Sequence, residues 1–304
     1  MGQAARKHSP VLSLEHGATA AQEHFDQEHF DRATCLLTEG NALFHQGDAQ
    51  GALTKYEECR ACGKKIRNAS LARQVEGSAT GSLGDAYNSI GKYATAGKHH
   101  KLALAVARET GDRQGEGNAL GNLALSYFGF GHHPEAIDHY NQALAVVREI
   151  GDRSGEAQEM GNLGLVYFSL GQYTEAIRHH ELALAISRQI GDRRGEGQDL
   201  SNLGLAWFGF GHHAVAISHF KKALAIVADI GDRDGSILGN LVPLEQQGWV
   251  DLSRALEHGR VEITRLEASS SGPMFTAAAK AAIAGGDVKV LDSSTPAELT
   301  EVCC

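Results

Sequence analysis

The 304-residue sequence has few cysteines, a deficit of basic residues and no long apolar run. Five cysteines are too few for the disulfide framework of a small secreted protein. Because 28 lysines and arginines face 37 aspartates and glutamates, the net charge of -9 would repel phosphate backbones, and we expect no nucleic-acid partner. No stretch approaches the roughly 20 apolar residues that span a bilayer, and the N-terminus lacks the apolar core of a signal peptide. We therefore expect a cytoplasmic protein without stable membrane insertion.

Catalytic and metal-binding signatures are also missing. The motifs G-x-S-x-G and H-E-x-x-H do not occur, and the glycines near residue 115 lack the spacing of a dinucleotide-binding loop. Cys59 and Cys62 form a single C-x-x-C pair, with no second pair to complete a zinc site. This favours Cys59 as a small residue packed between helices. The sequence predicts no enzyme activity, no cofactor and no metal.

What the sequence does contain is a forty-residue repeat. Residues 111–150 return as 151–190 and as 191–230, and the first and third of these copies agree at 24 of 40 positions. A fixed period of this length is typical of a solenoid, because one such unit cannot bury its apolar face alone and must stack on its neighbours. The fold class we expect is an all-α solenoid.

Glycine and aspartate mark the ends of the predicted helices. A glycine such as Gly91 or Gly131 splits each helical pair, and Asp112, Asp152 and Asp192 are placed to cap the next helix. No strand pattern is present. We expect a flexible N-terminus at 1–18, a solenoid over 19–246 with repeats near 33–66, 77–110, 117–150, 157–190 and 197–230 and a degenerate cap at 234–246, a C-terminal helix at 247–268 and a mobile tail at 269–304.

The spacing within the helical pairs resembles the tetratricopeptide repeat. Small residues at 124, 164 and 204 would let paired helices approach closely, while aromatic residues fill the space beside them. The resemblance implies a right-handed superhelix of about five helix-turn-helix repeats, closed by C-terminal capping helices. In the fourth repeat the family positions are occupied by Leu163, Gly164, Tyr167, Gly171, Tyr173, Ala176 and Ala183.

The connection GDRxGE and the phrase NLGL resemble one subclass in particular, the LGN or Partner-of-Inscuteable proteins. That subclass uses its repeats to grip extended peptides and a separate tail to bind G-protein alpha subunits. The repeated acidic-Gln-Arg motifs of that tail are absent here, so the resemblance implies peptide binding without G-protein regulation. The subclass tends to have arginine where this chain has Asn118 and asparagine where it has Leu125. Since a neutral amide does not suit a carboxylate as a guanidinium does, we expect a more apolar, less acidic peptide.

In such a superhelix the first helix of each pair lines the concave face, and residues three to four apart share that face. Side-chain amides both donate and accept hydrogen bonds, so a row of them can clamp the backbone of an extended peptide. Phenylalanines one turn further along would add apolar pockets. The alternative is that the asparagines bridge adjacent repeats and the phenylalanines belong to the core. The predicted peptide-binding residues are Asn118, Asn122, Leu125, Phe128, Gln158, Asn162, Leu165, Phe168, Gln198, Asn202, Leu205 and Phe208.

Histidine is abundant, and its positions follow the repeat. His99, His139, His179 and His219 recur at one position of the second helix. We expect several histidines to replace the aromatic residues of the repeat and the others to be solvated. Because histidine titrates near pH 6, protonation there is expected to loosen the stack.

These patterns predict a non-catalytic adaptor that holds an extended peptide or helical segment of a partner protein in a concave groove. Two alternatives remain open. One is a structural subunit that packs through its convex face in a larger assembly. The other is a lipid-tethered recruiter, since Gly2 begins half of a myristoylation signal and Cys303 and Cys304 resemble a prenylated terminus. A single acyl chain would give only weak, reversible anchoring.

Overall fold

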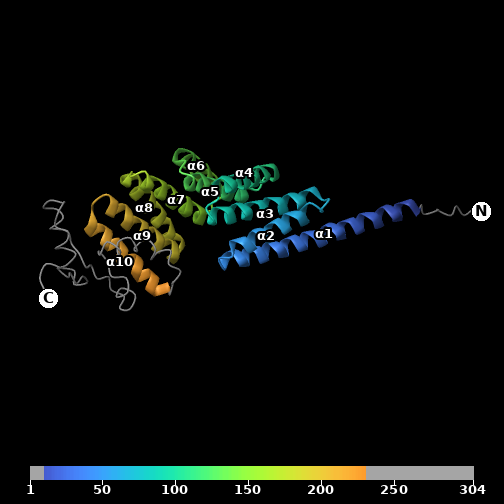
Figure 1. Cartoon of the computed structure of the whole chain (residues 1–304), viewed down its shortest axis with the longest axis horizontal. Helices are drawn as coiled ribbons and strands as arrows, with labels where there is room; N and C mark the ends of the chain where they lie inside the picture. Colours follow the sequence, from blue (N-terminus) through green and yellow to red (C-terminus); the bar gives the residue numbers. More distant parts are fainter. Residues whose placement is uncertain (1–9, 231–304) are drawn as a thin grey trace, which may run out of the picture. The chain divides into compact units, whose positions relative to one another are not determined.

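A computed structural model describes residues 10–230, which form ten helices and no strand (Figure 1). This confirms the predicted all-α class and its helix-turn-helix repeats. The predicted cap, C-terminal helix and tail, together with Gly2, Cys303 and Cys304, lie outside the described residues. The helices are α1 (Pro10–His45), α2 (Ala49–Gly63), α3 (Ala69–Ser89), α4 (Tyr93–Thr110), α5 (Arg113–Gly129), α6 (His133–Glu149), α7 (Arg153–Ser169), α8 (Tyr173–Ile190), α9 (Arg193–Gly209) and α10 (His213–Ile230).

The chain divides into two compact units between Val146 and Val147. Unit 1 contains α1 to α5 and most of α6, and unit 2 contains α7 to α10. From α1 to α5 and from α7 to α10, helices that follow one another in the sequence pack side by side, and α3 also contacts α5 as α7 contacts α9. First helices therefore lie next to first helices inside a unit, which is the arrangement that a shared binding face requires. None of the described helices has the length and apolar character needed to cross a bilayer.

The leading helix α1 begins earlier than the sequence indicates. Its described part runs from Pro10, so residues 10–18 of the segment expected to be flexible (1–18) are helical. Further along α1, Asp26 accepts hydrogen bonds of 2.9 Å from the backbone N–H groups of Arg67 and Asn68. These bonds, that from Arg67 foremost, lower the pKa of Asp26 and fix α1 to the start of α3.

The turns use glycine and aspartate as predicted. Gly91, inside a helical pair, has a φ of 74°, and Gly111, between pairs, has a φ of 71°. This left-handed backbone is open to glycine without a steric penalty. Asp112, Asp152 and Asp192 each accept a hydrogen bond of 2.8 to 2.9 Å from the backbone N–H three residues later. Each connection between pairs thus ends one helix and caps the next.

A buried glutamate joins consecutive helical pairs, a role for the GDRxGE motif that the sequence did not reveal. Glu116 accepts a hydrogen bond of 2.8 Å from Nε of Arg108, near the end of α4, and another from Arg113 at the start of α5. The bonds from Arg108 and Arg113 lower the pKa of Glu116, although burial opposes them. The same arrangement, one glutamate bonded to two arginines, recurs at the next two junctions. Glu156 binds Arg148 and Arg153, and Glu196 binds Arg188 and Arg193.

Replacing Glu116 with glutamine should lower the free energy of unfolding by about 1–2 kcal/mol at pH 7, because the charge that holds both guanidinium groups is removed. The folded-state pKa of Glu116 is lowered, so its contribution is present above the ordinary value of 4.5 and is lost as the pH falls. Urea unfolding at pH 7 and pH 4 measures the difference. Glu175→Gln is the matched control, since its pair with Arg178 lies on the exposed surface and should contribute less than about 0.5 kcal/mol. Equal losses of unfolding free energy in the two variants would contradict a stabilising role for the bonds between Glu116 and the two arginines.

In four helical pairs, a ring on the second helix packs against a glycine on the first helix. A methyl group added at any of these four glycines would overlap the facing ring, so the predicted close approach of paired helices is confirmed. Cys59 is also buried in a hydrophobic cluster, as predicted, and burial raises its pKa to about 11. The ring and glycine pairs are Tyr56 with Gly40, His100 with Gly84, His180 with Gly164, and Phe220 with Gly204.

Candidate functional site

The first helices of three pairs, α5, α7 and α9, carry the predicted peptide-binding residues. On each helix an amide, a second amide, a leucine and a phenylalanine follow one another at intervals of three or four residues, so they lie along one side of the helix. In unit 2, α7 contacts α9, which places two of these series beside each other.

The amides differ in how far solvent reaches them. Asn118 and Gln158 are exposed, and Asn122 and Asn162 are partly exposed. Asn202 is only 5% exposed. The accessible amides are therefore Asn118 and Asn122 on α5 in unit 1, and Gln158 and Asn162 on α7 in unit 2.

Several of these amides also bond within their own helix. The amide nitrogen of Asn162 donates to Oε2 of Glu159 at 3.4 Å. In α9, the nitrogen of Gln198 donates to the oxygen of Asn202 at 3.3 Å. These bonds are long, so they orient the amides at little cost to their capacity for a ligand, since each amide has two donor hydrogens and two acceptor lone pairs.

The apolar members of the series are placed less uniformly. Leu125 is 41% exposed, while Leu165 and Leu205 are partly exposed. The three phenylalanines are partly buried, and each contacts the ring of the first residue of the following helix. The ring centres are 5.7 Å apart for Phe128 and His133, 5.7 Å for Phe168 and Tyr173, and 4.7 Å for the stacked pair Phe208 and His213. In unit 1, Leu125 therefore has more exposed surface to offer a ligand than Phe128.

Two buried carboxylates on these helices were missed by the sequence analysis. Glu159 is 5% exposed and Asp199 is 6% exposed, and burial raises the pKa of each to about 7. Asp199 accepts a hydrogen bond of 3.0 Å from the hydroxyl of Ser187 in α8. The signal was present, because the equivalent position in the third repeat is Ala119, and an acidic residue there interrupts the apolar face.

The histidines behave largely as expected. His100 and His180 are buried at the ring position that Tyr140 and Phe220 hold in other repeats, which confirms that histidine replaces the aromatic residue. His179 stacks on Tyr167 with ring centres 5.2 Å apart. Burial lowers the pKa of His100 and His179 to about 4 and that of His180 to about 3. In the folded chain, protonation of these three histidines therefore requires a lower pH than the expected value near 6.

The repeat spacing and this packing agree with a comparison to known families. The sequence profile of the tetratricopeptide repeat family matches residues 76–149 and 156–229, and a second profile of the same description matches 122–189. The chain belongs to the tetratricopeptide repeat family. Together the matches of this tetratricopeptide repeat protein run from α3 to the end of α10.

Solved structures of similar fold support the same assignment, at identities that show the fold alone. BtubC (BKLC) from P. vanneervenii has a TM-score of 0.56 and 21% identity, and the match covers 70% of this chain and 90% of that one. A Rap protein complexed with competence and sporulation factor has a TM-score of 0.59 at 16% identity, covering 71% and 64%. The Rap conjugation gene regulator of the plasmid pLS20, in complex with the Phr* peptide, has a TM-score of 0.58 at 15% identity, covering 83% and 72%. No relative was found among curated protein sequences.

Proposed function

We propose that this tetratricopeptide repeat protein is a non-catalytic adaptor that binds a peptide segment of a partner protein along its first helices. The observation that carries the proposal lies in unit 2, where α7 contacts α9 and the accessible amides Gln158 and Asn162 on α7 are accompanied by the partly exposed Gln198 on α9. In unit 1, α5 carries Asn118 and Asn122 at the same places in its own helix. Amides at fixed intervals match the alternating donors and acceptors of an extended backbone. Because the helices are held by buried rings and capped junctions, little ordering is needed on binding.

Two similar folds support a peptide as the ligand. One Rap structure contains competence and sporulation factor, and the pLS20 Rap regulator contains the Phr* peptide. The identities of 16% and 15% are too low to transfer a sequence preference. The two complexes are consistent with a peptide site in a repeat fold of this kind.

The chemistry of the series favours a neutral, partly apolar peptide. The amides are uncharged, and Leu125, which is 41% exposed, lies one turn beyond Asn122. No arginine stands in these positions to pair with an acidic side chain. Together with the GDRxGE connections, this supports our proposal of an LGN-like repeat style with an altered peptide preference.

The test is a peptide selection followed by affinity measurement. Peptides of random sequence are selected on the full chain, and the strongest binder is measured by calorimetry against wild type and against Asn122→Ala with Asn162→Ala. Losing both amides should weaken binding about tenfold or more, because each contributes hydrogen bonds worth about 1 kcal/mol. Asn202 is left intact because its burial means that a substitution there would also disturb packing.

The control variant combines Asn141→Ala with Gln142→Ala on α6, which removes two amides from a second helix. It should bind as wild type does. If the two double variants bind alike, the first helices are not the peptide site, and the alternative of a structural subunit that packs through its second helices gains support. Retained melting temperatures in both variants exclude unfolding as the cause of a loss.

A further inference from the structure

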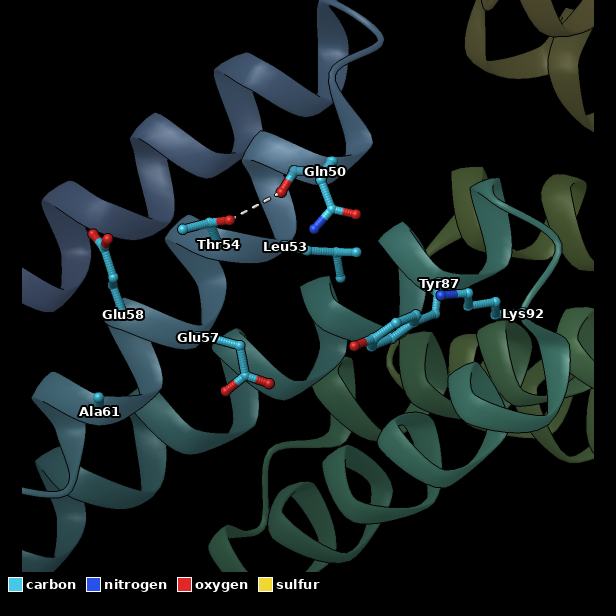
Figure 2. A pocket seen from close by; sticks show the side chains of 8 residues that line it. All are labelled: Gln50, Leu53, Thr54, Glu57, Glu58, Ala61, Tyr87 and Lys92. Carbon is cyan, nitrogen blue, oxygen red and sulfur yellow. Dashed lines mark hydrogen bonds between the residues drawn. The ribbon is translucent and has the colours of Figure 1, made fainter.

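Unit 1 contains a hollow that none of the predicted groove residues lines, and Leu53 and Tyr87 connect it to a hydrophobic cluster. The hollow has a volume of about 550 Å³ and lies where α2 faces the end of α3 and the turn before α4. Leu53, Thr54 and Glu57 of α2 line it together with Tyr87 of α3 and Lys92 of the turn (Figure 2). The size lies within the range of sites for small groups, so a ligand side chain fits.

An aromatic ring and a carboxylate converge on this hollow. Figure 2 shows the carboxylate end of Glu57 and the hydroxyl end of Tyr87 pointing toward one another from two different helices. The Tyr87 ring is held by His99, which stacks on it with ring centres 5.3 Å apart and an interplanar angle of 18°. A fixed ring beside a carboxylate attracts a cation in two ways, through the electron-rich ring face and through charge.

The next repeat shows what occupies the equivalent place. Tyr127 corresponds to Tyr87, and Lys101 corresponds to Glu57, because Lys101 follows His100 as Glu57 follows Tyr56 at the ring position of its helix. There the chain supplies its own cation: Nζ of Lys101 lies 5.3 Å from the centre of the Tyr127 ring. In the first repeat a carboxylate stands where that lysine would be. The ring is therefore built the same way, but the position beside it now favours a cation from outside.

The cations already near Glu57 do not fill the hollow. Nζ of Lys92 is 6.0 Å from the centre of the Tyr87 ring, at the limit of a useful cation–π contact. Arg60 reaches Glu57 only at 3.4 Å, one turn away on the same helix, and the Glu57 side chain is 53% exposed. An exposed pair of this kind contributes at most about 0.5 kcal/mol, so a ligand displaces it easily.

We propose that this hollow binds an arginine or lysine side chain from a basic segment of a partner protein, with the cation between the Glu57 carboxylate and the Tyr87 ring. The apolar stem of that side chain would lie against Leu53, and Thr54 and Lys92 also line the hollow. The net charge of -9 favours the approach of a basic segment. None of the amide residues lines this site, so a partner that used both would present a neutral stretch and a basic side chain.

Nuclear magnetic resonance titration of the full chain tests the site with the probe acetyl-Ala-Arg-Ala-amide. The Leu53 methyl and Tyr87 ring signals should shift saturably, and the same peptide with citrulline in place of arginine should bind about tenfold more weakly, because it has the shape without the charge. Glu57→Lys should also lower the affinity about tenfold or more, since it recreates the filled arrangement of Lys101 and Tyr127. The variant should fold, because the next repeat accommodates lysine at this position.

Glu28→Lys is the matched control, because it makes the same charge change at an exposed position of α1, in the same unit, and Glu28 does not line the hollow. It should leave the affinity within about twofold of wild type, since an exposed charge outside the site is screened by solvent and salt. Equal losses in Glu57→Lys and Glu28→Lys would show a general charge effect and overturn the site. Shifts that are absent, that do not saturate or that map away from Leu53 and Tyr87 would overturn it as well. The groove variant Asn122→Ala with Asn162→Ala should bind this probe normally, so the two proposals fail independently.

Discussion

Replacing Phe220 with alanine should lower the stability of the last two repeats by about 3–5 kcal/mol. The ring is 1% exposed and packs against Gly204, whose missing side chain is the space that the ring fills. Removing it leaves a cavity between α9 and α10, and backbone without side chains on the glycine side cannot close it. Repeat arrays unfold regionally, so hydrogen exchange of α9 and α10 together with urea unfolding measures the loss.

The chain provides its own control for this substitution. Gly164 with His180 has the same construction as Gly204 with Phe220, so Phe220→His should cost less than Phe220→Ala at pH 8. The new histidine should add a loss in acid. Burial lowers the pKa of His180 to about 3, so such a ring is neutral in the fold, and its contribution is present above the ordinary value of 6.5 and lost as the pH falls. If alanine and histidine at 220 lose equally at pH 8 and pH 5, the ring is not the main stabilising contact.

Replacing Asp199 with asparagine should raise the stability of unit 2 at pH 8 by about 1–3 kcal/mol, because a buried charge is removed while the hydrogen-bond acceptor is kept. The folded-state pKa of Asp199 is raised from 3.8 to about 7 by burial. Its favourable contribution is therefore complete below the ordinary value of 3.8 and lost as the pH rises through 7. The gain from Asp199→Asn should be large at pH 8 and nearly absent at pH 4, as measured by urea unfolding.

The surroundings of Asp199 explain the direction of this change. Ser187 of α8 and the backbone at Gly161 of α7 face the carboxyl group and bring no charge, and Asp192 at the start of α9 raises its pKa further. Asp199→Ala with Ser187→Ala restores the pair found in the third repeat, Ala119 and Ala107, and should likewise remove the pH dependence. The buried histidines titrate with the opposite sign, so the difference between wild type and variant isolates Asp199. A difference that does not grow with pH would contradict the raised pKa.

Most of the helical architecture could be predicted because the forty-residue period marks it several times over. The predicted repeats 157–190 and 197–230 end with α8 and α10, since a glycine turn before each of these helices and an apolar series within it define its ends. The helix over residues 10–18 could not be predicted, because Pro10 is compatible with a loop as well as with a helix.

The candidate site was harder to predict, and for a physical reason. Periodicity tells which side of a helix faces inward, but it does not tell which inward positions meet the next repeat. Glu159 and Asp199 interrupt the apolar face in the sequence, yet both are buried in the structure. The hollow at Glu57 and Tyr87 was missed because it depends on how α2 packs on α3, two helices joined by a connection unlike the later ones. The predicted amides lie on the first helices α5, α7 and α9, and their role in binding stays a prediction.

The identical connections have a consequence for how the gene can change. Ile150 is followed by Gly151, Asp152 and Arg153, and Ile190 by Gly191, Asp192 and Arg193, so excising 151–190 would rejoin the chain in frame with an intact stop and start signal. Unequal recombination can therefore add or remove a whole helical hairpin and leave the Gly-Asp-Arg connection at the new junction unchanged. The agreement of residues 111–150 with 191–230 at 24 of 40 positions is what duplication within the array would leave behind, and the number of repeats is then a property that can vary.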